Sequence, residues 1–318
     1  MKKGLIITAI ILCAAGLAVF AAAFILSGFD ISKLGTAEYV TNTYAPDGEF
    51  RNIEIKTPVT DIVFIPSSDG RLSVECTEIK NATHSVSVEN GTLLIECNDT
   101  RSWFERISLF GRPLTMTVCL PADTFGTLKI ENSTGKVSVP GGFSFDGAEI
   151  SVSTGSVSFC SNVQGLLNIS ASTGSVRVTG TEAGAISVSV ATGSVTSENI
   201  SCKGPFSVKT STGHTSLKNA ECVSLKAESR TGSVDLENVT ASESFSIDTR
   251  TGAVHFNRCD ADQIRVETTT GSVSGTLLSD KIFSAKTSTG SVRVPDSASG
   301  GRCEITTSTG GINIEIAK

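Results

Sequence analysis

The sequence predicts an all-β protein whose main part is a parallel β-solenoid (β-helix) of about ten regular coils of 19–20 residues. Two observations carry this prediction. A Thr-Gly pair recurs ten times at intervals of 19 or 20 residues, and apolar residues alternate with polar ones on both sides of each pair. A fixed short period of this kind is typical of stacked repeat architectures. The repeat glycines are Gly135, Gly155, Gly174, Gly193, Gly213, Gly232, Gly252, Gly271, Gly290 and Gly310.

The register of the repeat predicts the strands within each coil. The residues seven and five positions before each glycine are apolar in all ten repeats, and eight of the ten residues two positions after it are valine. Alternation with period two predicts a strand with one buried face. The buried phase changes across Thr-Gly, so we expect the chain to bend there, where glycine tolerates a positive φ. A weaker third segment suggests a roughly triangular coil, and we expect each coil to stack in parallel on the one before it in the sequence.

The first residues of the chain predict a membrane anchor. Residues 1–4 include two lysines, and residues 5–26 are apolar, which is long enough to span a bilayer. The positive-inside rule then leaves the N-terminus in the cytoplasm and the solenoid outside the cell. A cleaved signal peptide is the competing interpretation, because Ala21–Ala23 offers small residues near its end. Either interpretation exports the solenoid.

The remaining chain divides into three predicted segments. Residues 27–48 form a polar linker, residues 49–125 form irregular N-terminal coils and a cap, and residues 126–318 form the regular Thr-Gly solenoid. Residues 98–113 break the regularity with mixed arginine and aromatic side chains. Such a surface could contact a partner or a membrane, or it could serve as the cap that solenoid ends require. Its candidate surface residues are Arg101, Trp103, Phe104, Arg106, Phe110 and Arg112.

No pattern in the sequence indicates an enzyme. Coil length varies by one residue, which leaves no insertions from which to build a catalytic cleft. His84, His214 and His255 lack metal-ligand spacing, so we expect no metal and no cofactor. A net charge of −6 argues against a nucleic-acid partner, which needs concentrated positive charge.

Cysteine usage leaves one question open. Cys202 and Cys222 occupy equivalent positions on adjacent predicted coils, so their Cα atoms should lie about 4.8 Å apart. That separation is within disulfide range. Both a bridge and two free thiols fit this spacing.

The chain also resembles a known family. The N-terminal span, the strand ending Val118-Cys119-Leu120-Pro121, and the repeated Leu-x-Ile-x-x-Ser-Thr-Gly-Ser-Val-x-Val coils resemble the bacterial putative-adhesin domain of unknown function, over roughly residues 50–318. The resemblance implies a membrane-anchored envelope protein with a β-repeat fold. Its motif consists of structural positions, so it implies no catalytic residues.

From these observations we expect a membrane-anchored, non-catalytic binding or scaffold module at the cell surface, adhesin-like, with a protein or glycan partner. The alternative is an accessory regulator of a cell-envelope stress or signalling system, since some members of the family that this chain resembles sit beside such systems. A polysaccharide-active β-helix enzyme is a third and weaker hypothesis.

Overall fold

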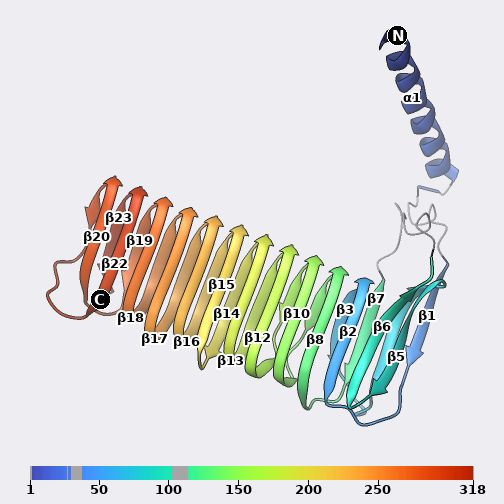
Figure 1. Ribbon diagram of the computed structural model, residues 1–318, viewed down its shortest axis with the longest axis horizontal. Coiled ribbons are helices and arrows are strands. Elements are labelled where there is room, and N and C mark those ends of the chain that lie inside the picture. Colours follow the sequence, from blue (N-terminus) through green and yellow to red (C-terminus); the bar gives the residue numbers. More distant parts are fainter. Residues whose placement is uncertain (1, 27, 30–37, 102–113, 318) are drawn as a thin grey trace.

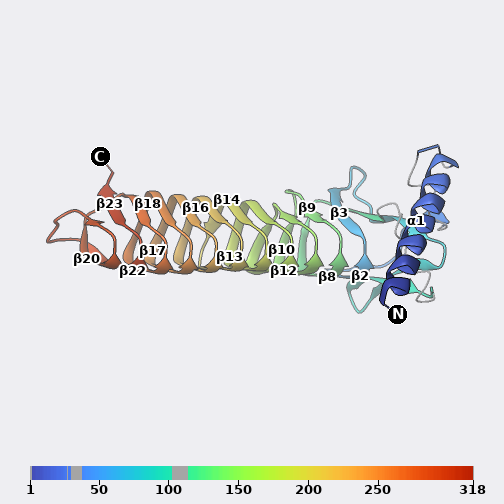
Figure 2. The same ribbon diagram turned by 90° about the horizontal axis from the view of Figure 1, so that it is seen from above.

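The protein is a long β rod with a single apolar helix at its N-terminal end (Figure 1). The computed structural model describes residues 2–26, 28–29, 38–101 and 114–317. Within these residues the strands β1 to β23 join edge to edge into one continuous hydrogen-bonded array. Seen from above, the coils stack along one axis from β2 to β20 (Figure 2). The predicted all-β solenoid is therefore confirmed.

The N-terminal helix α1 (Lys2–Leu26) contains the segment Ile6–Leu26, which is long and apolar enough to cross a membrane, a criterion that a signal sequence also meets.

The N-terminal end of the rod is a small mixed sheet rather than a regular coil. Its strands are β1 (Tyr39–Tyr44), β2 (Asn52–Val59), β3 (Asp61–Pro66), β4 (Ser73–Ile79), β5 (Ala82–Glu89), β6 (Thr92–Asp99) and β7 (Thr115–Leu120). β2 and β3 form the first coil and pair in parallel with β8 and β9. β4 pairs antiparallel with β7 and with β1, and β5 pairs antiparallel with β6. These antiparallel strands cover the N-terminal end of the solenoid, and β1 lies inside the segment that was predicted to be a linker.

The regular coils follow in sequence order through β19. Their strands are β8 (Thr124–Thr134), β9 (Val137–Val139), β10 (Ser144–Thr154), β11 (Val157–Phe159), β12 (Asn162–Thr173), β13 (Val176–Thr192), β14 (Val195–Cys202), β15 (Pro205–Thr212), β16 (Thr215–Thr231), β17 (Val234–Thr251), β18 (Val254–Thr270) and β19 (Val273–Leu277). Equivalent repeat positions pair directly, as Val188 does with Val208. Some strands span almost a whole coil. β16, for example, runs from just after one Thr-Gly pair to the next, because the other bends of the coil do not interrupt its hydrogen bonding to neighbouring strands.

The Thr-Gly corner leaves no space for a side chain. Gly193 has a φ of 142°, and a Cβ on it would overlap the carbonyl oxygen of Gly174 in the coil below. The Gly193 amide donates to the Thr212 carbonyl at 2.8 Å in the coil above. Inward hydroxyls add support, since Thr249 Oγ1 donates to the Gly252 carbonyl at 3.2 Å. Close backbone approach is therefore the physical reason for the glycine column.

The core is one continuous apolar interior that runs the length of the rod. Ile150, Ile169 and Val188, which lie five positions before their glycines, are each at most 1 % exposed. Phenylalanines reinforce the N-terminal half, where the ring centroids of Phe125 and Phe145 lie 5.9 Å apart. Burial of such side chains stabilises each coil by about 1.5–3 kcal/mol per large residue.

The two final coils are exchanged relative to the predicted order. They consist of β20 (Lys281–Thr289) with β21 (Val292–Arg293), and β22 (Gly301–Thr309) with β23 (Ile312–Ile316). β22 pairs with both β18 and β20, and β23 pairs with both β19 and β21. The last coil in sequence therefore lies inside the rod, and the coil before it forms the end (Figure 1). Our expectation of strict sequence-order stacking is wrong at this point.

Candidate functional site

A column of residues in the left-handed backbone conformation marks a second corner of the solenoid. It lies six positions after the repeat glycine in five successive coils. The φ values are 61° at Gly180, 57° at Asn199, 51° at Asn219 and Asn238, and 54° at Arg258. Asparagine is several-fold enriched among non-glycine residues with positive φ. The local sequence thus provides residues suited to this turn in four of the five coils.

The three asparagines form an amide ladder along the rod. Asn219 Nδ2 donates to Asn199 Oδ1 at 3.0 Å, and Asn238 Nδ2 donates to Asn219 Oδ1 at the same distance. All three side chains are exposed. A primary amide has two N–H donors and an oxygen with two lone pairs. Each ladder member therefore retains hydrogen-bonding capacity for a ligand.

The ladder lines an open surface groove, which we call the corner groove. Its volume is about 580 Å³. It extends over the coils from Gly180 to Leu278, and it is bordered by side chains of both charges. The residues that define it for our argument are Glu182, Asn199, Asn219, Glu221, Asn238 and Arg258.

The electrostatics of the corner groove are mixed. The exposed carboxylates of Glu182 and Glu221 lie along it, and the exposed guanidinium of Arg258 lies at the end nearer the C-terminus. The lining has two carboxylates and one guanidinium, a slight excess of negative charge, and the amides between them are neutral. A ligand rich in both donors and acceptors, without strong net charge, fits such a lining.

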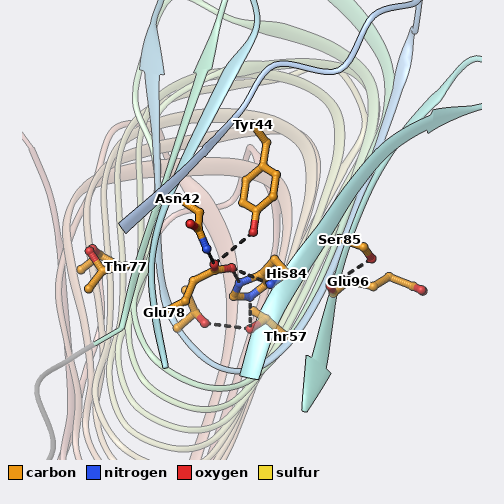
Figure 3. A network of polar contacts seen from close by, with 10 residues as sticks. Asn42, Tyr44, Thr57, Thr77, Glu78, His84, Ser85 and Glu96 are labelled. Atoms are coloured by element: carbon orange, nitrogen blue, oxygen red, sulfur yellow. Dashed lines mark hydrogen bonds and ion pairs between the residues drawn. The ribbon is translucent and has the colours of Figure 1, made fainter. Parts of the chain in front are cut away.

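A second polar cluster is buried at the N-terminal end of the rod (Figure 3). The Glu78 carboxylate on β4 is fully buried, yet it accepts four hydrogen bonds. His84 on β5 donates to Oε1 from its backbone amide at 2.5 Å and from Nδ1 at 2.8 Å. From β1, Asn42 Nδ2 and the Tyr44 hydroxyl donate to Oε2 at 2.5 and 3.0 Å. One carboxylate thereby connects three strands.

The cluster continues beyond the carboxylate. The other ring nitrogen of His84, Nε2, lies 3.2 Å from Thr57 Oγ1, which is 2.8 Å from Thr60 Oγ1. Cys76 Sγ belongs to the same cluster, because single ligand atoms of Cys76, Glu78 and His84 all lie within 4.8 Å of one another.

Burial and the Glu78 charge alter the acid–base behaviour of the neighbours. Burial, followed by the hydrogen bond and the negative charge of Glu78, raises the pKa of Tyr44 to about 12. Burial, and then the Glu78 charge, also raises the pKa of the Cys76 thiol to about 12. Both groups are therefore neutral at physiological pH, beside a site of negative potential.

The predicted arginine and aromatic surface is only partly within the described residues. Arg101 makes a two-point ion pair with Asp99, with Nε 2.9 Å from Oδ1 and a terminal nitrogen 2.9 Å from Oδ2. Trp103, Phe104, Arg106, Phe110 and Arg112 lie outside the residues that the structure describes. The role of residues 98–113 remains a prediction.

The cysteines predicted to be neighbours occupy adjacent coils as free thiols. The Cys202 and Cys222 side chains are both buried. Burial, followed by the charge of Cys202, raises the pKa of Cys222 to about 12. Of the two alternatives left open by the spacing, the structure contains the unbridged form.

The sequence analysis predicted neither the asparagine ladder nor the buried cluster around Glu78, although the sequence contains a pattern that indicates each of them. Asn199, Asn219 and Asn238 recur at the repeat period, which would have revealed the ladder. His84 lacks metal-ligand spacing in the sequence, but Cys76 and Glu78 are two residues apart on one strand and so share a face. The hairpin between β4 and β5 then brings His84 to them.

The protein is a parallel β-solenoid, and the coils that carry the corner groove follow the 19- or 20-residue repeat. A family model described as Toastrack DUF4097 matches residues 50–238 and 204–318. The chain belongs to this family.

Two solved structures resemble the chain at low sequence identity, and the first of them shares its fold. A putative lipid binding protein from Parabacteroides distasonis ATCC 8503 is 18% identical with a TM-score of 0.50, over 77% of this chain and 98% of that one. A putative adhesin from Bacteroides fragilis NCTC 9343 is 15% identical with a TM-score of 0.43, over 88% and 99%. A comparison with curated proteins finds no match.

Proposed function

We propose that the protein is a membrane-anchored, non-catalytic surface module that binds an extended, hydroxyl-rich glycan along the corner groove. The observation that carries the proposal is the amide ladder of Asn199, Asn219 and Asn238, which lines an open groove. The helix α1 would hold the module at the membrane, with the N-terminus in the cytoplasm and the rod outside.

The chemistry of the groove favours a glycan over other polymers. Successive coils are about 4.8 Å apart, so the ladder offers donors and acceptors at regular, short intervals. Sugar hydroxyls both donate and accept hydrogen bonds, as amides do. The carboxylates of Glu182 and Glu221 repel polyanions, as does the net charge of −6. An open groove with ordered polar groups suits an elongated chain better than a small apolar molecule.

Binding measurements with a matched pair of variants test the proposal. The full chain in detergent would be titrated by calorimetry with soluble neutral polysaccharides, with a polyanionic polysaccharide as comparison. Asn219→Gly preserves the left-handed turn while removing the central amide, and Asn168→Ala removes an amide from β12, outside the groove. We expect Asn219→Gly to weaken binding at least about tenfold, the loss of one or two hydrogen bonds, and Asn168→Ala to leave it unchanged.

Two outcomes would contradict the proposal. Equal loss of affinity in both variants would place the ligand elsewhere, and release of reducing sugar ends would indicate hydrolysis. The alternative role as an accessory regulator of an envelope signalling system is separated by replacing α1 with an unrelated membrane helix. A binding rod tolerates that exchange, whereas a regulator acting through its helix loses its effect.

A further inference from the structure

We propose that Cys76, Glu78 and His84 bind a divalent transition metal ion of the Zn²⁺ type at the N-terminal end of the rod. This site is separate from the corner groove and does not depend on glycan binding. The three residues supply one sulfur, one oxygen and one nitrogen ligand, the donor types that zinc takes in proteins.

The first argument is the convergence of the three side chains. One ligand atom from each lies within 4.8 Å of the other two, and the residues are 0 %, 0 % and 4 % exposed. Zinc bonds of about 2.0–2.3 Å in a tetrahedron place ligand atoms about 3.3–3.7 Å apart. The Glu78 Oε1 and His84 Nδ1 atoms, now 2.8 Å apart, would therefore separate by less than about 1 Å to admit the ion.

The second argument is that the outer contacts of the ligands are already in place. A metal-bound histidine normally donates its other ring N–H to an oxygen, and His84 Nε2 lies 3.2 Å from Thr57 Oγ1. Asn42 and Tyr44 hold Oε2, so Glu78 would bind the ion through Oε1, which keeps the hydrogen bond from the His84 backbone amide and loses the one from Nδ1. These contacts hold the imidazole and the carboxylate so that Nδ1 and Oε1 face each other at 2.8 Å, where an entering ion would meet both atoms.

The third argument concerns charge. The cluster contains the fully buried Glu78 carboxylate, and a divalent cation stabilises the thiolate form of a coordinating cysteine. On binding, the Cys76 sulfhydryl releases its proton to solvent, and the ring proton that Nδ1 donates to Glu78 in the metal-free protein moves to Nε2, which leaves Nδ1 free to bind the ion. One thiolate, one carboxylate and one divalent ion leave no net charge in the buried cluster.

Strand β1 gives the ion a route inward. β1 covers the cluster with Asn42 and Tyr44, which are half-buried, and it pairs with β4. Among the described strands β1 pairs only with β4, so its displacement would expose Glu78 without breaking a ladder of the solenoid coils. A solvent molecule from this side can complete a four-coordinate site, as in zinc sites that keep one open position.

Cobalt substitution tests the assignment directly. The untagged full chain in detergent would be stripped with a chelator and titrated with Co²⁺, then with Zn²⁺. We expect one equivalent of Co²⁺ to produce tetrahedral visible absorption and a thiolate-to-cobalt charge-transfer band, both lost when Zn²⁺ displaces it. Cys76→Ser should remove the charge-transfer band, and His84→Gln should weaken binding at least about tenfold. Cys303→Ser and His255→Gln serve as controls, because they alter a buried thiol and a histidine far from the cluster.

A second measurement covers the case in which the cluster variants fail to fold. In the unmodified chain at moderate urea, bound Zn²⁺ should slow alkylation of Cys76 at least about tenfold while leaving that of Cys303 unchanged. The proposal is overturned if Co²⁺ gives no thiolate band, if that band persists in Cys76→Ser, or if Zn²⁺ fails to protect Cys76.

Discussion

Thr268 on β18 pairs with Thr307 on β22, and Thr307 in turn pairs with Thr287 on β20. The coil that comes last in the sequence is therefore inserted between two coils that precede it. The inserted coil buries Cys303 and Ile305, whereas the terminal coil leaves Val292 at 44% exposure.

The exchanged order predicts which coil tolerates truncation of its core side chain. Ile305→Ala should destabilise the protein by about 2–4 kcal/mol, because Ile305 is fully buried. Phe283→Ala removes a larger side chain, but Phe283 is only partly buried at the end of the rod, so we expect a smaller loss. Urea denaturation of the two variants tests this ranking. A larger loss for Phe283→Ala would support stacking in sequence order.

This exchange also shows how far the sequence predicts the fold. Period and register identify the coils because each repeat buries the same positions. They do not identify the neighbours at the end, because coils that share the Thr-Gly corner can stack in more than one order. Ala285 and Ile305 occupy equivalent, paired positions in the two coils, and the period assigns both of them to the core without ordering the coils.

The two candidate sites also differ in how far the sequence predicts them. The asparagine ladder lies in the periodic part, so its members could be found by counting from the repeat glycine. The Glu78 cluster lies in the irregular end, where Asn42, Thr57 and His84 come from three different strands. Those contacts depend on antiparallel pairings that no period specifies.

The glycine column predicts a severe effect of one methyl group. Gly193→Ala should lower the free energy of unfolding by at least about 2 kcal/mol, because the new Cβ meets the Gly174 carbonyl at a φ of 142°. Gly147→Ala is the matched control, since its Cβ would be 4.0 Å from its nearest neighbour, the Leu166 carbonyl oxygen. We expect the control to be neutral or to stabilise by about 0.4–1 kcal/mol. Similar losses in both variants, measured by urea denaturation, would contradict the close-approach explanation.

The amide ladder predicts a stabilising substitution. Arg258 continues the column with a φ of 54°, a conformation that asparagine tolerates better than arginine. Arg258→Asn should stabilise the protein by about 0.5–1.5 kcal/mol, because its amide can donate to Asn238 Oδ1 and extend the ladder. Arg258→Leu is the control for loss of charge, because it removes the guanidinium without supplying an amide. It should not stabilise the protein. Thermal unfolding of both variants distinguishes them, and equal stability would show that the ladder does not extend.

Burial of Tyr44, together with its hydrogen bond to Glu78, predicts a loss of stability at high pH. The pKa of Tyr44 is about 12 in the folded protein against an ordinary value of 10.0. The folded state therefore holds this proton more tightly than the unfolded state does. The resulting stabilisation is complete below pH 10 and is lost as pH rises from 10 towards 12.

The chain has two tyrosines, so in Tyr39→Phe the ultraviolet phenolate signal reports Tyr44 alone. After a rapid pH jump, that signal should titrate well above pH 10, and adding Glu78→Gln should move it downward because the charge is removed. Urea denaturation should show a shallower decline above pH 10 in Tyr44→Phe than in Tyr39→Phe. Titration of Tyr44 near pH 10 in the folded Tyr39→Phe protein would show that burial and the Glu78 carboxylate do not raise the pKa of this phenol.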